Sequence, residues 1–428
     1  MARLEARSQR VPLAATRVVI DVRPLQEPDR TPLTADYLGK LLGAFAAEPV
    51  EGESFVVLTR ALRPDPTVEL ERDGLPIAGR RVLPPTSRVF RSAGITLDSF
   101  LLRAAEIGSA ASEPDDGDTA ARPVGSVYHT AGGAVPLASG LPVVATLLDT
   151  APWELPAAYL ASPAARFGHR LRRRVLRDAA RVIVCSSAVG DLAQRRLHLP
   201  RERIAIVPLA VDPAFRRAGR DKTAQARVRG RLQLAPRYLA FAGRYDARKD
   251  LATLFGALRS LVESSSREAA PRVVFAGPFD TPEERDTLAG AVARSGAASQ
   301  IDVAPILSVN DRAALIGGAV GFVYPALSDA TGGPLLEALS LGVPVITSRT
   351  GALPEQVGGA GIVVEPRDER RLAAALSALW ETQTLAGQLT KVAQTRATKW
   401  SRTWADVGRE TRAVYAAVAL EAEIDRGQ

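Results

Sequence analysis

The sequence predicts an α/β protein built from two doubly wound parallel sheets. Short runs rich in valine and isoleucine are apolar at almost every position, which is typical of strands covered on both faces. Segments with helical periodicity lie between these runs, as they do in βαβ units. The chain has 428 residues, more than one core usually serves, and it holds two such sets, before residue 212 and after residue 237.

Ten runs are expected to form strands, with helices between them. In chain order they are RVVIDV (17–22), FVVLT (55–59), VVATLL (143–148), RVIVC (181–185), IAIVP (204–208), YLAFAG (238–243), RVVFAG (272–277), GFVYP (321–325), VPVIT (343–347) and GIVVE (361–365). The first intervening segment, DYLGKLLGAFAAE, places Leu38, Leu41 and Phe45 on one helical face. A helix with one apolar face suits the outer layer of a doubly wound sheet.

The chain is expected to divide into two domains joined by a basic linker. The expected parts are a flexible N-terminus (1–15), an N-terminal domain (16–215), a linker with a helix (216–236), a C-terminal domain (237–398) and a terminal helix (399–428). The segment 108–125 is rich in small and acidic residues and lacks apolar periodicity, so it is expected to be a mobile surface loop.

Composition excludes several classes of protein. No apolar run approaches the roughly 18 residues that span a bilayer, and the basic N-terminus lacks the apolar core of a secretory signal, so a cytoplasmic location is expected. The single cysteine, Cys185, excludes an internal disulfide, and the three histidines lack metal-ligand spacing, so no metal site is expected. A net charge of +8 fits anionic ligands, a membrane surface or nucleic acid.

The stretch SDATGGPLLEALS (328–340) has the features of a ligand-binding strand end. It follows the strand GFVYP, and ligands of open α/β sheets bind beyond the carboxyl ends of the strands. Gly332 and Gly333 open a helix, where backbone N–H groups favour an anion, and Glu337 lies one turn inside that helix. The alternative is an ordinary loop–helix junction with Glu337 in solvent.

A second loop, AGRYDARKDL (242–251), follows the strand YLAFAG and carries two cations. Arg244 offers a planar fork to phosphate oxygens, and Lys249 offers a point charge. Two cations near a helix N-terminus would suit a diphosphate leaving group. The alternative is a solvated basic surface loop.

Taken together, these residues resemble the retaining glycosyltransferases of family 4, whose GT-B fold has two doubly wound Rossmann-like domains facing each other across a cleft. FAGRYDARKDLATLFGAL resembles the opening of the family's nucleotide domain, and SDATGGPLLEALSLGVPVITS resembles its signature of two acidic residues separated by seven. The resemblance implies that Arg244 and Lys249 hold the diphosphate of a nucleotide-sugar donor. It also implies that Glu337 binds the ribose, while Gly332, Gly333 and Leu335 bring backbone amides to the donor.

The resemblance extends to the reaction and to the rest of the chain. It implies a hexosyltransferase of polysaccharide biosynthesis that needs no metal or other cofactor and passes a sugar to a saccharide or lipid-linked acceptor with retention. The first domain would serve the acceptor, and the segment WSRTWADVGRETRAVYAAV would cross back to it. Asp149 and His129 are the candidates for acceptor-side contacts. The sequence leaves the nucleotide base, the acceptor and the oligomeric state open.

Three positions depart from the family pattern. The first acidic position is Asp329 instead of Glu, Leu148 replaces a histidine that faces the donor sugar, and the first domain's glycine turn reads TPLTADY (31–37). One hypothesis is an active enzyme whose donor sugar lacks a 6-hydroxyl, such as rhamnose, in place of mannose or glucose. The other is a non-catalytic partner or scaffold protein.

The segment 166–182 carries seven arginines and one acid, with an apolar stripe at helical spacing. A basic amphipathic helix of this kind can lie on anionic lipid, which would place the protein peripherally on the inner face of the membrane. The alternative is a helix whose stripe faces the core. Aromatic residues make up only 5% of the chain and do not interleave with this run, so nucleic acid is not expected as a partner.

Overall fold

The computed structural model describes residues 15–83, 125–132, 139–264, 270–279 and 281–427. The expected flexible N-terminus and nearly all of the expected loop 108–125 lie outside these ranges. The chain forms two compact units. The N-terminal unit comprises the described residues of Met1–Pro152, Tyr159–Pro208 and Trp404–Gln428, and the C-terminal unit comprises those of Trp153–Ala158 and Leu209–Thr403. None of the described helices combines the length and the apolar character needed to cross a membrane.

The N-terminal unit is built on a seven-stranded parallel sheet in the order β3-β2-β1-β4-β5-β6-β7. Its strands are β1 (Arg17–Asp21), β2 (Ser54–Arg60), β3 (Ile77–Leu83), β4 (Ser126–Ala131), β5 (Val143–Leu147), β6 (Arg181–Val184) and β7 (Ile204–Ile206). The central strand β5 is buried along its whole length, as a strand covered on both faces must be. The order reverses between β1 and β4, which makes that pair the switch point of a doubly wound sheet.

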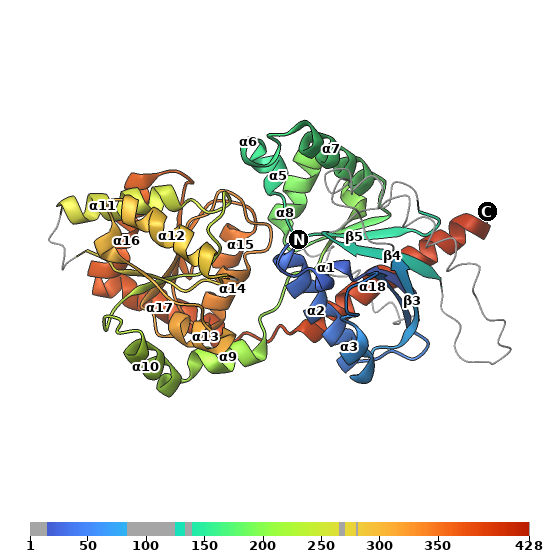
Figure 1. Ribbon diagram of the computed structural model, residues 1–428, viewed down its shortest axis with the longest axis horizontal. Coiled ribbons are helices and arrows are strands. Elements are labelled where there is room, and N and C mark those ends of the chain that lie inside the picture. The colour runs from blue at the N-terminus through green and yellow to red at the C-terminus, as the bar shows by residue number, and fades with distance from the viewer. Residues whose placement is uncertain (1–14, 84–124, 133–138, 265–269, 280, 428) are drawn as a thin grey trace. The chain divides into compact units, whose positions relative to one another are not determined.

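Helices flank this sheet (Figure 1). They are α1 (Arg23–Gln26), α2 (Pro32–Ala47), α3 (Val68–Arg72), α7 (Pro163–Asp178), α8 (Ser187–Leu192) and α18 (Trp404–Gly427), with short helical turns at Ala193–Leu197 and Arg201–Arg203. The short helices α5 (Ala151–Glu154) and α6 (Pro156–Tyr159) contain the residues at which the chain passes to the C-terminal unit and returns. The helix α2 buries Leu38, Leu41 and Phe45, the apolar face that its sequence predicts.

A buried ion pair anchors the terminal helix α18 to the N-terminal unit. Arg412 Nη2 lies 2.8 Å from Glu53 Oε2, and both side chains are almost fully buried. Arg412 also donates to the Phe45 carbonyl and lies over the Phe45 ring. Burial raises the pKa of Glu53 although Arg412 opposes the shift. The last helix of the chain is therefore part of the N-terminal unit's core.

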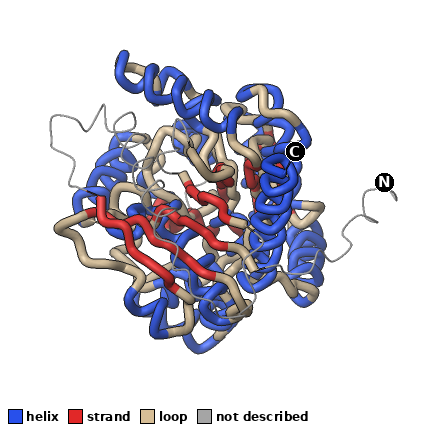
Figure 2. Tube along the Cα trace, turned by 90° about the vertical axis from the view of Figure 1, so that its right-hand side faces the viewer, coloured by secondary structure: helices blue, strands red, loops and turns tan. Residues whose placement is uncertain are grey.

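The C-terminal unit is built on a six-stranded parallel sheet in the order β10-β9-β8-β11-β12-β13. Its strands are β8 (Leu239–Phe241), β9 (Val273–Phe275), β10 (Ile301–Val303), β11 (Gly321–Tyr324), β12 (Val345–Ser348) and β13 (Gly361–Val364). Every residue of β8, β9, β11 and β12 is buried. The order of this sheet reverses between β8 and β11. In Figure 2 the strands of the N-terminal sheet lie side by side with helices around them.

Helices cover both faces of the second sheet (Figure 1). They are α9 (Pro213–Arg220), α10 (Lys222–Arg231), α11 (Leu251–Ser264), α12 (Pro282–Arg294), α13 (Val309–Gly317), α14 (Gly333–Ser340), α15 (Leu353–Val357), α16 (Glu369–Glu381) and α17 (Gln383–Thr398), with a helical turn at Ala298–Gln300. The helix α11 packs against α16, whereas α13 packs against α9 and α10.

The segment expected to be a linker is part of the C-terminal unit, which begins at Leu209. Residues 216–236 contain the end of α9 and all of α10. Two arginines of α10, Arg227 and Arg231, each lie 2.9 Å from a carboxylate oxygen of Asp311 on α13. The helix α10 buries few apolar side chains, so its attachment depends on these ion pairs and its sequence shows little apolar periodicity.

Candidate functional site

The two loops singled out in the sequence come together at the switch point of the C-terminal sheet. The loop 242–250 leaves the carboxyl end of β8, and the loop 325–332 leaves that of the neighbouring β11. Lys249 and Ala326 pair as an isolated antiparallel bridge, and the Leu327 N–H donates to the Arg248 carbonyl at 2.7 Å. Ligands of open α/β sheets bind at such a reversal of strand order.

Lys249 lies at the centre of a buried polar cluster. Its ammonium donates to the Tyr324 hydroxyl and to Asp329 Oδ2, the latter at 3.3 Å, and Tyr324 in turn donates to Asp329 Oδ2 at 2.6 Å. The side chains of Lys249 and Asp329 are 6% and 9% exposed. An ammonium has three N–H groups, and among the described residues only these two partners are recorded for it. One donor of Lys249 therefore remains for a ligand.

Asp329 is a fixed anion that also holds the following turn. Its Oδ1 accepts from the backbone N–H groups of Thr331 at 3.0 Å and Gly332 at 2.7 Å. Burial disfavours the charged form, but Lys249, the Tyr324 hydroxyl and these two N–H groups outweigh it and lower the pKa of Asp329 to about 2. The first acidic residue of the signature thus neutralises Lys249 and shapes the start of α14.

Arg244 lies on the same loop as Lys249 but is more accessible. Its side chain is 22% exposed, and Nη1 lies 3.6 Å from Glu284 Oε2 on α12. The neighbouring Arg248 is held by Asp246, with Nη2 2.5 Å from Oδ2, and this pairing contributes to the lowered pKa of Asp246. The two arginines of this loop are thus about equally exposed, and the one at 244 lies farther from its carboxylate than the one at 248 does.

The two glycines at the start of α14 have different structural reasons. Gly332 has a φ of 59°, and a Cβ on it would lie 1.9 Å from Gln356 Oε1, so any other residue there is strained and must displace the Gln356 amide. A Cβ on Gly333 would meet nothing within 4 Å. Within the described part of the chain, the N–H groups of Gly333 and Leu335 have no recorded partner. Gly333 is partly exposed, whereas Leu335 is fully buried. The helix thus presents the N–H donor of Gly333, at a position where packing does not require glycine.

Glu337 lies on α14, one turn beyond these donors. Its side chain is 20% exposed, and Oε1 lies 3.5 Å from Arg312 Nη2 on α13. The carboxylate is therefore neither buried nor freely solvated. An arginine at this distance holds it loosely enough for a second hydrogen-bond donor, such as a ribose hydroxyl, to share it.

The N-terminal unit contains Leu148 and Asp149, directly after β5. Leu148 is 2% exposed, so it belongs to the core and presents no apolar wall to a ligand. Asp149 Oδ1 accepts from the Ala151 N–H at 2.9 Å and so begins α5. Burial and the charge of Arg172 lower the pKa of His169, whereas the Asp149 carboxylate acts in the opposite direction. Asp149 therefore lies near the side chains of His169 and Arg172.

His129 is a core residue of the N-terminal unit, contrary to the expected acceptor-side role. It is fully buried on β4, with Nε2 2.9 Å from Thr146 Oγ1 and Nδ1 2.7 Å from the Tyr415 hydroxyl of α18. Burial lowers the pKa of His129 to about 3. Both ring nitrogens are engaged and no part of the side chain reaches solvent, so the histidine ties α18 to the sheet.

A glycine just after β4, Gly132, lies close to the glycine-free turn 31–37. The helix α2 begins at Pro32, and Gly132, just after β4, approaches its first turn with a φ of 63°. A Cβ on Gly132 would lie 2.4 Å from Thr34 Oγ1. Gly132 thus allows the end of β4 to pack closely against the first turn of α2.

Three residues of this site were not predicted from the sequence: Tyr324, Arg312 and Gln356. Tyr324 could have been suspected because it is the one polar side chain at the end of a strand that leads into the signature. Gln356 carries no local signal, because its contact with Gly332 depends on how α15 packs. The described residues contain no group of three or more His, Cys, Asp or Glu side chains that could hold a metal ion.

Comparisons with known proteins match both units. The model described as "Glycosyl transferases group 1" matches residues 236–382, and the model described as "Glycosyltransferase Family 4" matches residues 124–215. The Anabaena protein HepE in complex with UDP-glucose has a TM-score of 0.66 at 14% identity, covering 94% of this chain and 99% of that one. At this identity the likeness shows the fold alone.

Two curated relatives are mannosyltransferases. The O-antigen chain mannosyltransferase B of Escherichia coli is 30% identical over 45% of this chain and 49% of its own. The MMP α-(1→4)-mannosyltransferase of Mycolicibacterium hassiacum is 27% identical over 57% and 56%. The match thus spans about half the length of each. The matched models and the two parallel-sheet units show that the chain belongs to the group 1, family 4 glycosyltransferases and has their GT-B fold.

Proposed function

We propose that the chain transfers a hexose, with mannose as the first candidate, from a nucleotide-diphosphate donor to a saccharide or lipid-linked acceptor with retention of configuration. The observation that carries the proposal is the cluster at the C-terminal switch point. Buried Lys249 keeps one donor for a ligand there, and the helix α14 begins with unpartnered N–H groups beside it. The names of the two curated relatives support mannose.

The catalytic contribution of these residues is electrostatic. Negative charge develops on the departing diphosphate, and preorganised donors around it lower the barrier. Lys249, Arg244 and the N–H group of Gly333 supply those donors, while Glu337 accepts from the ribose. Their positive charge provides what a divalent cation would otherwise provide, and on this basis we propose a metal-independent reaction.

The burial of Leu148 bears on the choice of sugar. An apolar contact that favours a 6-deoxy sugar requires an exposed apolar surface, and Leu148 offers only 2% of its own. Leu148 therefore gives no support for a preference for rhamnose. The shorter Asp329 is already fully engaged by Lys249, Tyr324 and two N–H groups, so its substitution for Glu reflects the local network.

A donor panel tests the proposal. We expect calorimetric binding and slow hydrolysis with GDP-mannose, weaker turnover with UDP-glucose or dTDP-rhamnose, and no change on adding EDTA. The Glu337→Gln chain should bind the productive donor about 10- to 100-fold more weakly, because a hydrogen bond to a charged group contributes about 1.5–3 kcal/mol. Absence of binding to every nucleotide would support the non-catalytic alternative instead.

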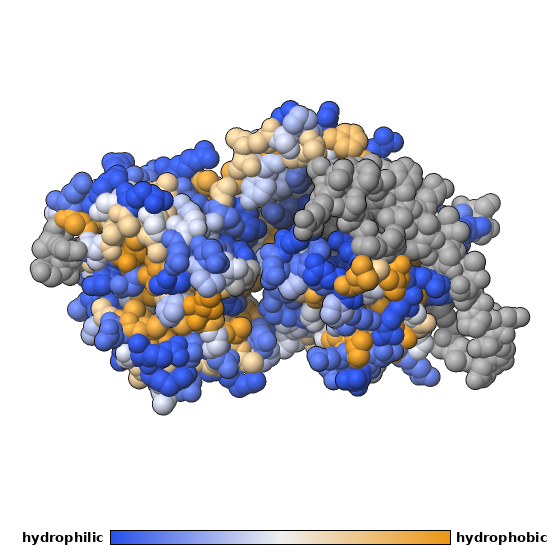
Figure 3. Space-filling view, viewed as in Figure 1, coloured by the Kyte–Doolittle hydropathy of each residue, from blue (hydrophilic) through white to orange (hydrophobic). Residues whose placement is uncertain are grey.

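The helix α7 also supports a proposed contact with anionic lipid. Val175 and Leu176 of the apolar stripe are buried, but Phe167 is 52% exposed, and Arg170 and Arg174 are exposed. Figure 3 shows hydrophobic side chains on the surface over α6 and α7. An exposed aromatic ring among arginines can insert at a lipid headgroup boundary.

Vesicle sedimentation checks this contact. We expect the chain to sediment with phosphatidylglycerol vesicles at low salt and not with phosphatidylcholine, and Phe167→Ser to reduce the bound fraction several-fold. Ile424→Ser is the matched control, because Ile424 is 53% exposed on α18 of the same unit. Equal loss in both variants, or binding insensitive to lipid charge, would contradict the assignment.

A further inference from the structure

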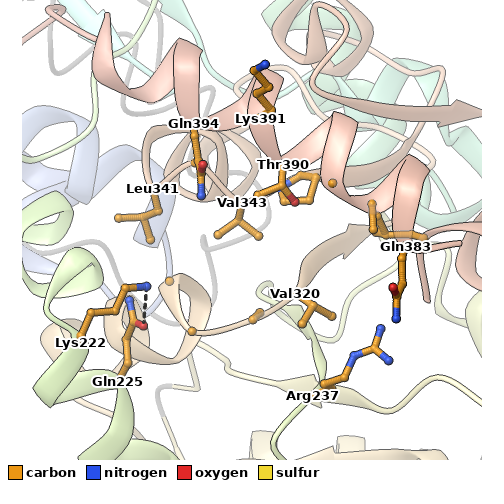
Figure 4. A pocket seen from close by; sticks show the side chains of 18 residues that line it. Lys222, Gln225, Arg237, Val320, Leu341, Val343, Gln383, Thr390, Lys391 and Gln394 are labelled. Carbon is orange, nitrogen blue, oxygen red and sulfur yellow. Dashed lines mark hydrogen bonds between the residues drawn. The ribbon is translucent and has the colours of Figure 1, made fainter. Parts of the chain in front are cut away.

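A second pocket lies on the C-terminal unit, at the edge of the sheet opposite the donor cluster. It has a volume of about 630 Å³ and is bounded by the segments that lead into β11 and β12 and by one face of α17 (Figure 4). All strands of this sheet are parallel, so the amino ends of β11 and β12 are at the edge away from Lys249. The helix α14 begins at the donor cluster and ends at this pocket, at Leu341 and Gly342.

Three cations line the pocket, and no carboxylate does. They are Lys222 of α10, Arg237 just before β8, and Lys391 of α17. Other arginines of the chain, such as Arg227, Arg231 and Arg349, form ion pairs with a carboxylate. No ion pair is recorded for these three cations within the described residues. The Lys222 ammonium donates to Gln225 at 3.2 Å, and Arg237 donates to the Trp380 carbonyl at 2.7 Å. The pocket thus carries positive charge without a counter-charge.

Helix ends at the pocket do not cancel this charge. Two helices, α13 and α14, end here, and free carbonyls at a C-terminus would favour a cation. The carbonyl of Leu315 accepts from the Tyr238 hydroxyl, and that of Ser340 accepts from Arg220, each at 2.8 Å. The carbonyl of Leu339 accepts from the Gly342 N–H. Carbonyls at both helix ends are therefore already paired, and the lysines and the arginine dominate.

Uncharged groups between the cations suit a ligand with hydroxyls. Gln383 and Gln394 come from α17, and each amide offers both donors and an acceptor. Gln225 of α10 donates to the Gly219 carbonyl at 2.7 Å and accepts from Lys222. In Figure 4 the Arg237 and Gln383 head groups face each other on one side, and Lys222 and Gln225 lie together on the other. Val320, Leu341 and Val343 lie between them. Charged and amide groups around an apolar floor are typical of sites for small polar molecules.

The surface of α17 leaves room in this pocket. Gly387 lies in the interior of the helix, where glycine costs about 0.5–1 kcal/mol relative to alanine. A Cβ on Gly387 would meet nothing within 4 Å, so packing does not require glycine there. Because Gly387 has no side chain, α17 leaves more space in the pocket at this position.

We propose that this pocket binds a small phosphorylated sugar, at a site separate from the donor site. The phosphate lies at Arg237, and the sugar extends over the apolar floor towards Lys222 on the opposite side, with Lys391 at the rim. Lys222 and the amides of α17 bind the sugar hydroxyls. The binding goes beyond glycosyl transfer, and it does not depend on which donor or acceptor the transfer uses.

Calorimetric titration of the full chain with mannose 6-phosphate tests the proposal, with neutral mannose as the matched probe. We expect saturable binding of the phosphate and none of mannose. Lys222→Gln and Arg237→Gln should each weaken the binding at least about ten-fold. Gly387→Leu adds a side chain without changing charge and should abolish it, and its thermal midpoint shows whether the chain is folded.

Arg244→Gln separates the two sites. This substitution weakens the donor cluster, and binding of mannose 6-phosphate to it should equal that of the unaltered chain. Loss of binding in Arg244→Gln with retention in the pocket variants would show that the phosphate enters the donor site and would overturn the proposal. Absence of saturable binding at millimolar concentration would overturn it as well. Because the readout is binding, neither result bears on glycosyl transfer.

Discussion

A Lys249→Met chain is expected to lose sugar transfer by about a hundred-fold or more. Removing one preorganised donor from developing negative charge typically costs two to three orders of magnitude in rate. The substitution also leaves the Asp329 carboxylate buried without its cation, which typically costs about 3–5 kcal/mol when one partner of a buried pair is removed. We therefore expect a lower unfolding midpoint in urea for the C-terminal unit together with the loss of turnover.

The Lys249→Met/Asp329→Asn chain separates these two effects. Replacing the carboxylate by an amide removes the uncompensated charge, so the urea midpoint should recover most of the difference. Turnover should stay at the level of the single variant, because the donor facing the diphosphate is still missing. Near-normal transfer in the single variant, or recovery of transfer in the double variant, would show that Lys249 acts through folding alone.

The pH dependence of this cluster follows from its pKa. The pKa of Asp329 is lowered to about 2, so its contribution to stability is complete above the pKa of an unfolded aspartate, about 3.9, and is lost as pH falls towards 2. Between pH 5 and 8 Asp329 stays ionised. A titration of transfer in that range must therefore come from another group, such as the substrate.

Strand positions could be predicted well because burial on both faces leaves a continuous apolar run. RVVIDV became β1 and GFVYP became β11, and each strand ends one residue earlier than expected. The strands that were missed, β3, β4 and β10, are those whose residues are mixed. IAGRRVL carries two arginines at the edge of its sheet, SVYHTA carries polar side chains that bond inside the core, and IDV has three residues.

The candidate site was predictable only as far as topology determines it. Carboxyl ends of parallel strands share one edge, so Lys249 and Asp329 could be placed in one region from the sequence. Which carboxylate is free for a ligand could not be derived, because it depends on the Tyr324 hydroxyl and on the N–H groups of the turn. His129 shows the same limit, since its burial depends on a contact with Tyr415, 286 positions away.

The adjacent glycines of α14 are expected to respond oppositely to alanine. Gly332→Ala should destabilise the C-terminal unit, since a left-handed backbone costs a non-glycine residue about 1–2 kcal/mol. Displacing the Gln356 amide should add about 1–3 kcal/mol. Gly333→Ala should instead stabilise the unit by about 0.4–1 kcal/mol, because its Cβ meets nothing and the unfolded chain loses freedom.

Transfer should respond in the other direction at Gly333. If the donor diphosphate lies against the N–H group of Gly333, a methyl group there moves it outward, and a displacement of about 1 Å costs up to a hundred-fold in rate. We therefore expect Gly333→Ala to unfold at higher urea while the KM for the donor rises about ten- to hundred-fold. Gly332→Ala/Gln356→Ala is the matched control, since it removes the clash and leaves the backbone cost together with the lost hydrogen bond from Gln356 to the Thr331 carbonyl. A Gly333→Ala chain with unchanged donor kinetics would place the diphosphate elsewhere, because stability cannot explain a glycine at a position where alanine is better.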